Sequence, residues 1–223
     1  MLSIISYLRN GEYLLAVISI LSSCFVVFCC LPVHELAHGY IAYKLGDDTA
    51  KKQGRLTFNP FAHLNPIGTI MIFLFGIGYA RPVPVNPNRF KNPKGGMALV
   101  AIAGPLSNLL MAFVFNFVYI ALAANFNMTG FMGAVMYFFY FAAWVNITLA
   151  VFNLFPIPPL DGSKVLAALL PNRIYNKYMM YERYIMIALF VLLFTGVLDK
   201  PISIVSGFFM RLISYLPALI FMR

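Results

Sequence analysis

The amino-acid sequence predicts an all-α polytopic membrane protein with about four to six transmembrane helices. Hydrophobic residues make up 61% of the 223 positions, and charged residues make up only 10%. Soluble domains carry about 25% charged residues, so this composition is typical of a protein that lies in a membrane. Several apolar stretches approach the roughly 20 residues that a helix needs to cross a bilayer. Because these stretches leave no room for a large soluble domain, we expect residues 1–223 to form a single membrane-embedded domain.

The first long apolar segment covers residues 14–45. At 1.5 Å per residue, a helix of this length exceeds the hydrocarbon core of roughly 30 Å. One end must therefore protrude from the bilayer, or the helix must bend. Pro32 can introduce a kink, because its ring lacks the N–H that a helix needs at that point. Gly46 and the two aspartates after it mark the predicted end of the helix.

Residues 56–87 are not typical of a membrane span, because they contain five prolines and several glycines. Only residues 69–78 are continuously apolar, and this run is too short to cross a bilayer. The pattern predicts a re-entrant loop, which is tolerated at membrane depth only where it packs in protein or lines a wet cavity. Residues 79–85 contain alternating prolines, which exclude both a helix and a central strand and favour a short, β-hairpin-like edge segment.

The rest of the chain contains further apolar segments. Residues 97–124 and 135–155 are each long enough to span a bilayer, whereas residues 184–198 are short unless the helix is tilted. Residues 201–222 carry an arginine at their middle. They form either a last span or a helix that lies at the membrane interface.

The net charge of +9 comes from basic residues in short loops. The basic loops are residues 44–55, 89–94 and 172–183, whereas residues 125–133 carry no charge. Loops retained in the cytoplasm are enriched in lysine and arginine, so the basic loops are expected on that side. This explains the charge without a nucleic-acid partner. We expect a multi-pass protein of the bacterial cytoplasmic membrane, in contact with the lipid bilayer.

The most informative motif is His-Glu-Leu-Ala-His at residues 34–38, which lies inside the first apolar segment. Two histidines four residues apart share one helical face and can hold one metal ion, and the intervening Glu35 can take a proton from water. An ionised group at the centre of a bilayer costs about 2.5–3.5 kcal/mol, so such residues are functional candidates. His38 is six residues from Lys44, which places the motif toward the cytoplasmic face.

A catalytic zinc site needs a third protein ligand and one open position. Asp161 lies in an apolar setting after a span that is predicted to end on the cytoplasmic side, at the depth of the motif. The alternative role for Asp161 is to cap a helix that begins near Gly162. Cys30 precedes His34 by four residues and shares its helical face, but we interpret it as a small buried residue.

The motif at 34–38, together with Asn-Leu-Phe-Pro-Ile-Pro-Pro-Leu-Asp-Gly at 153–162, resembles the site-2 protease family of intramembrane zinc metalloproteases. Further matches are Asn-Pro-Phe-Ala-His-Leu-Asn-Pro-Ile-Gly at 59–68, Arg-Pro-Val-Pro-Val at 81–85 and Gly-Pro-Leu-Ser-Asn at 104–108. The family includes larger members with an inserted PDZ or appended CBS domain. This chain is similar to a minimal, core-only member.

The resemblance implies one zinc ion per chain, with His34, His38 and Asp161 as ligands and Glu35 as the catalytic base. It also implies that Asn153 helps to hold the substrate or the oxyanion intermediate.

Other polar residues have alternative roles. His63 is either a residue that orders the site from behind the ligands or a buried loop histidine. Asn108 either lines the site or satisfies contacts between membrane helices. The segment at 81–85 either pairs with an unwound substrate as an added strand or only plugs the cavity. Its five residues are Arg81, Pro82, Val83, Pro84 and Val85.

These features predict a zinc-dependent endopeptidase that hydrolyses peptide bonds in or near the transmembrane segments of protein or peptide substrates. The alternative is a metal-binding membrane transporter or a non-catalytic scaffold, since transporters also place polar residues at membrane depth. Glu35 distinguishes the two, because only a protease needs a base between two ligands. The sequence names neither the natural substrate nor an oligomeric state.

Overall fold

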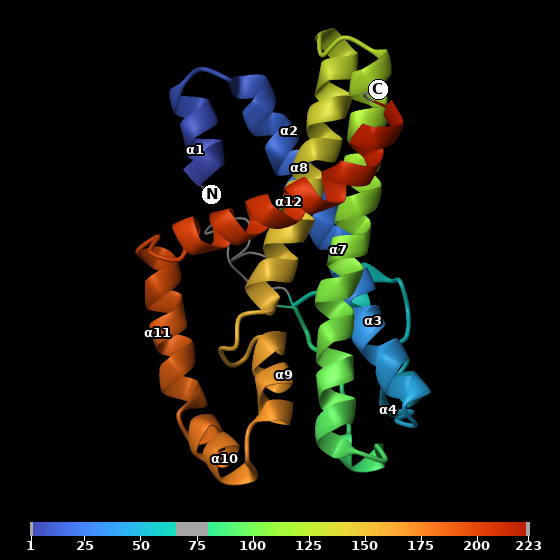
Figure 1. Ribbon diagram of the computed structural model, residues 1–223, viewed down its shortest axis with the longest axis vertical. Coiled ribbons are helices and arrows are strands. Elements are labelled where there is room, and N and C mark those ends of the chain that lie inside the picture. The colour runs from blue at the N-terminus through green and yellow to red at the C-terminus, as the bar shows by residue number, and fades with distance from the viewer. Residues whose placement is uncertain (1, 66–79, 222–223) are drawn as a thin grey trace.

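The computed structural model describes residues 2–65 and 80–221, and these residues are mainly helical (Figure 1). In these ranges there is no β-sheet, and strand pairing is limited to one isolated antiparallel bridge between Leu64 and Ala80. The prediction of an all-α fold is therefore confirmed, and the hairpin-like segment is reduced to this bridge. The predicted re-entrant loop lies largely outside the described residues.

The helices vary from single turns to elements of more than eight turns. In chain order they are α1 (Leu2–Arg9), α2 (Tyr13–Phe25), the π-helical turn η1 (Val26–Cys30), α3 (Leu31–Lys44), α4 (Thr49–Lys52), α5 (Pro60–His63), the 3₁₀ turn η2 (Pro87–Arg89), α7 (Pro93–Asn125), α8 (Gly130–Asn153), α9 (Asp161–Leu169), α10 (Asn172–Met180), α11 (Glu182–Phe194) and α12 (Asp199–Phe221).

Within the described ranges, four helical stretches are long and apolar enough to cross a membrane. They are the continuous stretch Tyr13–Lys44, α7, α8 and α12. This agrees with the lower end of the predicted number. The span predicted at 184–198 is not among them, because α11 has only 13 residues. Helix α12 has the length for a span, although it runs obliquely across α7 and α8 (Figure 1).

The stretch Tyr13–Lys44 contains a π-helical turn just before the metal motif. Pro32 lacks an N–H and occupies the first turn of α3, so it cannot continue the α-helical hydrogen bonding of the preceding residues. The turn η1 accommodates one extra residue at this point. Such π-bulges frequently occur at functional sites. The bend expected at Pro32 therefore takes the form of a local widening of the helix.

Helix α7 is the central element, because both α3 and α9 pack against it as well as α8. Helices α7 and α8 form a long antiparallel pair (Figure 1). Small residues at the helix contacts, such as the buried Ala112 and Ala142, let the backbones approach closely. The opposite face of α7 exposes a stripe formed by Leu106, Leu110 and Val114. A stripe of this kind is suited to contact lipid chains.

Candidate active site

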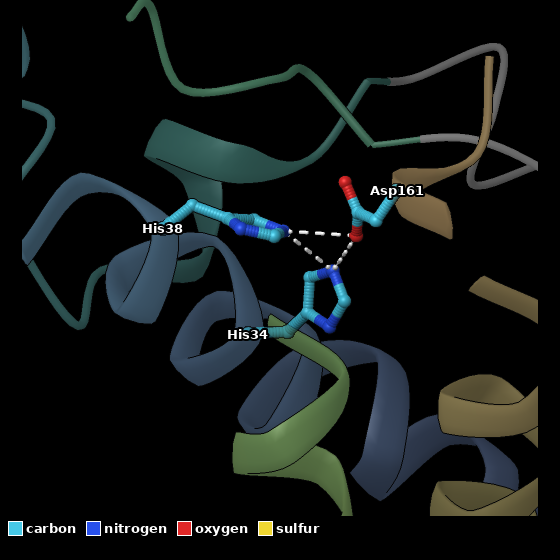
Figure 2. Close-up of side chains that lie close together, drawn as sticks. All are labelled: His34, His38 and Asp161. Carbon is cyan, nitrogen blue, oxygen red and sulfur yellow. Dashed lines mark hydrogen bonds and ion pairs between the residues drawn. The ribbon is translucent and has the colours of Figure 1, made fainter. Parts of the chain in front are cut away.

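Helix α3 presents the His-Glu-Leu-Ala-His motif toward the protein interior. His34 is 4% exposed, and Glu35 and His38 are each 8% exposed. Because the two histidines are one helical turn apart, their side chains lie on the same face. Their Nε2 atoms are 3.0 Å apart (Figure 2). The spacing predicted from the sequence is therefore realised with both ring nitrogens directed at one point.

Asp161 approaches the two histidines from the start of α9 (Figure 2). Its Oδ2 atom lies 3.3 Å from His34 Nε2 and 3.1 Å from His38 Nε2. The residue that precedes the helix is Leu160, and no side chain caps this helix end. Asp161 therefore faces the histidines, and the alternative role as a helix cap is not what the structure contains.

Gly162 explains how Asp161 reaches this position. A Cβ atom at residue 162 would lie 2.2 Å from the backbone oxygen of Leu154 and 2.5 Å from that of Phe155. Only glycine lets the first turn of α9 pack directly on the chain that leaves α8. This close contact holds Asp161 beside α3.

The three side chains fit a zinc ion. A tetrahedral zinc with bonds of about 2.0–2.1 Å separates its ligand atoms by about 3.3–3.4 Å. The separations of 3.0, 3.3 and 3.1 Å among the three ligand atoms are close to this value. His38 Nδ1 lies 2.7 Å from the backbone oxygen of Val100, the kind of contact that orients a metal-binding histidine. Among the described residues, His34, His38 and Asp161 are the group suited to hold a metal.

Gly104 on α7 forms the wall behind the histidines. A Cβ atom at this position would lie 2.3 Å from His38 Nε2 and 2.6 Å from His34 Cε1. Helix α7 can therefore press its backbone against both rings only because residue 104 has no side chain. The sequence identifies Gly104 only as a residue of the Gly-Pro-Leu-Ser-Asn match, and the contact with the histidines depends on how α7 packs on α3.

Gly104→Ala is expected to weaken zinc binding by at least about tenfold and to reduce proteolysis in parallel, because the new methyl group must displace the ligand rings. Zinc per chain after dialysis against a graded series of chelator concentrations measures the effect. Gly207→Ala is the matched control, since a Cβ atom at residue 207 of α12 meets no other atom within 4 Å. Normal zinc affinity in Gly104→Ala would show that the wall can give way without disturbing the ligands.

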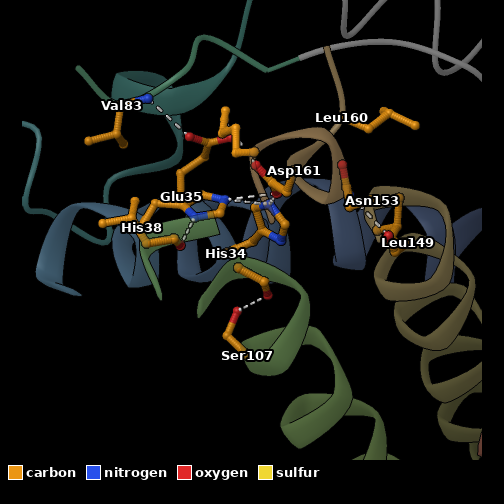
Figure 3. A network of polar contacts seen from close by, with 12 residues as sticks. His34, Glu35, His38, Val83, Ser107, Leu149, Asn153, Leu160 and Asp161 are labelled. Carbon is orange, nitrogen blue, oxygen red and sulfur yellow. Dashed lines mark hydrogen bonds and ion pairs between the residues drawn. The ribbon is translucent and has the colours of Figure 1, made fainter. Parts of the chain in front are cut away.

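Glu35 contacts the proline-containing segment rather than the ligands. Its Oε2 atom accepts a hydrogen bond of 3.1 Å from the backbone N–H of Val83 (Figure 3). The edge strand was predicted at 79–85, but residues 81–85 have no regular secondary structure. The physical reason is that Pro82 and Pro84 have no N–H, and the N–H groups of Arg81 and Val83 bond to His63 and Glu35. The segment therefore lies against α3.

Lys164 extends the site beyond the predicted residues. Its Nζ atom lies 3.1 Å from Asp161 Oδ1, one turn further along α9. Burial works to raise the pKa of the Asp161 carboxyl, but hydrogen bonds from His34 and His38 and the charge of Lys164 hold this pKa well below its usual range. Lys164 thus occupies one carboxylate oxygen and leaves the other to face the histidines. The sequence signal for Lys164 is its spacing of three residues from Asp161, which places the two side chains on one face of a helix.

The remaining sequence candidates lie outside the ligand cluster. His63 is buried, its Nε2 atom lies 2.8 Å from the backbone oxygen of Thr57, and its own carbonyl accepts the Arg81 N–H, so it orders the loop. Asn108 is buried in α7. Asn153 ends α8 and donates its side-chain N–H to Leu149 in the polar network of Figure 3. Cys30 packs among apolar residues, as interpreted from the sequence.

Comparison with known proteins identifies relatives. A family model for Peptidase family M50 matches residues 120–196, which include Asn153 and Asp161. The putative zinc metalloprotease YwhC of Bacillus subtilis is 47% identical over 166 residues, which are 73% of this chain and 75% of that protein. The putative zinc metalloprotease MJ0611 of Methanocaldococcus jannaschii is 31% identical over 134 residues, which are 60% of this chain and 62% of that protein.

The putative zinc metalloprotease Rip2 of Mycobacterium tuberculosis is 31% identical over 137 residues, which are 59% of this chain and 51% of that protein. No solved structure matches the chain. The extent of the match with YwhC, together with a ligand cluster suited to zinc, does not favour a transporter or scaffold. The chain belongs to the site-2 protease family of intramembrane zinc metalloproteases, Peptidase family M50.

Proposed function

We propose that His34, His38 and Asp161 hold the zinc ion of this protease, that Glu35 is the catalytic base, and that the substrates are membrane proteins cut in or near their transmembrane segments. The observation that carries this proposal is the convergence of three buried ligand atoms from α3 and α9, with their mutual separations of 3.0–3.3 Å. Glu35 follows His34 directly on α3, and Figure 3 shows its side chain beside the ligand cluster.

When bound, the zinc ion polarises the scissile carbonyl group and makes water acidic enough to lose a proton near neutral pH. Glu35 accepts a proton from the attacking water and then delivers it to the leaving amine, and the hydrogen bond from the Val83 N–H orients its carboxylate. Asn153 uses one side-chain N–H on Leu149, and its second N–H hydrogen is available to stabilise the developing oxyanion.

The segment at 81–85 is proposed to contact the substrate. A helical substrate hides its peptide groups in its own hydrogen bonds, so it must unwind before hydrolysis, and each unpaired backbone group in a dry site is costly. Because the N–H groups of Arg81 and Val83 are already bonded to His63 and Glu35, pairing by strand addition would rest mainly on carbonyl groups of the segment, which can accept N–H groups of the substrate. The contact between Val83 and Glu35 supports this role, because it holds the segment over the catalytic helix.

The proposal is tested by incubating the purified protein with zinc and a panel of single-span peptides and then mapping the fragments. We expect cleavage within or next to the apolar span of at least one peptide, and no fragments with the Glu35→Gln variant. Cleavage confined to soluble, unstructured peptides would contradict the proposed substrate class.

We propose further that the catalytic end of the molecule faces the cytoplasm of a bacterial cell. The basic segment at 44–55, which contains α4, the start of α7 and helix α10 lie at the same end of the molecule, and the uncharged loop between α7 and α8 lies at the other end (Figure 1). This grouping supports the orientation that the positive-inside rule gives.

Cysteine labelling in a background that lacks Cys24, Cys29 and Cys30 tests the orientation. Lys91→Cys is expected to react with an impermeant thiol reagent only when the cytoplasmic side is accessible, and Asn127→Cys only from the outside. Labelling of residue 91 in intact cells would reverse the proposed topology.

A further inference from the structure

Residues 81–86, which we call the proline strap, are tied down at both ends and in the middle. At the start, the Arg81 N–H donates to the His63 carbonyl at 2.7 Å. In the middle, the Val83 N–H donates to Glu35 at 3.1 Å. At the end, the Asn86 N–H donates to Asp47 Oδ2 at 2.6 Å. Two of the three tethers therefore end on carboxylates, and one of these is the proposed base.

Asp47 is a fully buried carboxylate outside the metal site, with an exposed fraction of 0%. It follows α3, and its own N–H donates to the carbonyl of Ala42 in the last turn of that helix. Its Oδ1 atom accepts hydrogen bonds from the N–H of Thr49 at 3.0 Å and from the Thr49 hydroxyl at 2.5 Å. Oδ2 is thereby left to bind Asn86 and to join the strap to the end of the metal helix.

The negative charge of Asp47 is stabilised by its neighbours. Burial works to raise its pKa, but the bonds from Thr49 and Asn86 and the nearby charge of Arg89 hold this pKa below its usual value. Because this carboxylate is buried, the loss of any of these hydrogen bonds would leave a costly unpaired group. The strap also has little freedom between its tethers, because a Cβ atom on Gly39 of α3 would lie only 3.0 Å from the Val83 side chain.

We infer that Asp47 is a positioning residue for proteolysis: by fixing Asn86 it holds the Val83 N–H against Glu35 and so fixes the orientation of the base. This inference rests on the proposed role of Glu35. Two residues, Pro84 and Val85, separate Val83 from Asn86, and the fixed φ angle of Pro84 makes this path stiff. A shift at Asn86 is therefore transmitted to Val83 instead of being absorbed between them.

The neighbouring Asp48 provides a matched control. It is about one-third exposed and pairs with Lys52 at 2.7 Å and with Arg89, so it carries the same charge one residue further along. Among the described residues, its ion pairs run to Lys52 and Arg89 and not to residues 81–86. Asp48→Asn therefore removes a charge from the same loop without releasing the strap.

The experiment compares Asp47→Asn, Asp48→Asn, Val83→Pro and the double variant Asp47→Asn/Val83→Pro, each purified with zinc. We expect Asp47→Asn to retain zinc and to lower kcat by roughly 10–100-fold, the effect of a misplaced catalytic group, with KM changed by less than about twofold. Asp48→Asn is expected to stay close to wild type. Hydrogen exchange of the amides at 83 and 86 should be faster in Asp47→Asn than in the wild type or in Asp48→Asn.

The double variant decides whether Asp47 acts through Val83. If it does, Asp47→Asn adds little to Val83→Pro, because the N–H that Asp47 positions is already absent. Independent, additive losses would overturn the inference. A rise in KM with unchanged kcat in Asp47→Asn would also overturn it, because Asp47 would then serve substrate capture instead of the base. An equal loss of kcat in Asp48→Asn would overturn it as well.

Two further measurements keep the outcome decisive. If Asp47→Asn fails to fold or to hold zinc, Asn86→Pro replaces it, because this change removes the N–H on Oδ2 and leaves the Thr49 bonds in place. Asn86→Ala keeps that N–H and should lose much less activity; equal losses in the two would reject the inference. If Glu35→Gln remains active, the proposed function fails, whereas an inactive Glu35→Gln with a normal Asp47→Asn rejects the inference alone.

Discussion

Glu35→Gln is expected to abolish proteolysis while the purified chain still carries about one zinc ion. The amide has nearly the same shape as the carboxylate, but it cannot accept the proton that hydrolysis requires. General acid–base catalysis contributes about 10²–10⁴-fold to a rate, so the loss should be at least of this size. Glu35 Oε2 faces the Val83 N–H rather than the ligand cluster, which is why the metal should remain.

The measurement is a pair of assays on one preparation, zinc per chain by elemental analysis and fragment yield with a transmembrane peptide. Glu35→Asp is a useful comparison, because it keeps the carboxylate but withdraws it from Val83, and it should retain partial activity. Loss of zinc together with activity in Glu35→Gln would mean that Glu35 helps to bind the metal.

Asp161→Ala is expected to lose both zinc and activity, whereas Cys30→Ala should lose neither. Removing residues that only support a metal ligand costs about 10–100-fold in affinity, so removal of a ligand should cost more than about 100-fold. Asp161 Oδ2 faces both histidine nitrogens. Cys30, although it lies one turn before His34, packs against Val26 and Ala142.

Metal content at a series of free zinc concentrations separates the two variants. A Cys30→Ala protein without zinc would show that the ligand set proposed here is wrong. An Asp161→Ala protein that still binds zinc tightly would mean that another residue replaces the carboxylate, and its activity would then show whether the substitute supports catalysis.

The local part of the site could be predicted from the sequence, because it depends on helical spacing alone. Two histidines four residues apart must share a face once the segment is helical, and the composition makes helices the default in a membrane. The position of Asp161 followed from topology and from the resemblance to a family. Its distance from the histidines depends on Gly162, whose contact with the end of α8 requires the folded chain.

The parts that could not be predicted depend on which elements meet. Gly104 looks like any small residue of a membrane helix until α7 is packed on α3, when it becomes the wall of the metal site. The alternating prolines at 81–85 correctly exclude a helix, but they do not reveal that the Val83 N–H bonds to a side chain instead of a strand. Asp47 likewise looks like part of a helix stop until its partner Asn86 is known.

The π-helical turn at Val26–Cys30 sets the angular phase between the two halves of the first long helix. The half before it, α2, packs on α8, and the half after it, α3, packs on α7. An α-helix advances about 100° per residue, and the wider π-turn absorbs an extra residue that would otherwise rotate everything downstream by about that angle. The face that carries His34 and His38 is thus aimed by a count of residues rather than by any side chain. A further residue inserted after η1 would rotate His34 and His38 by about 100° and turn them away from α9.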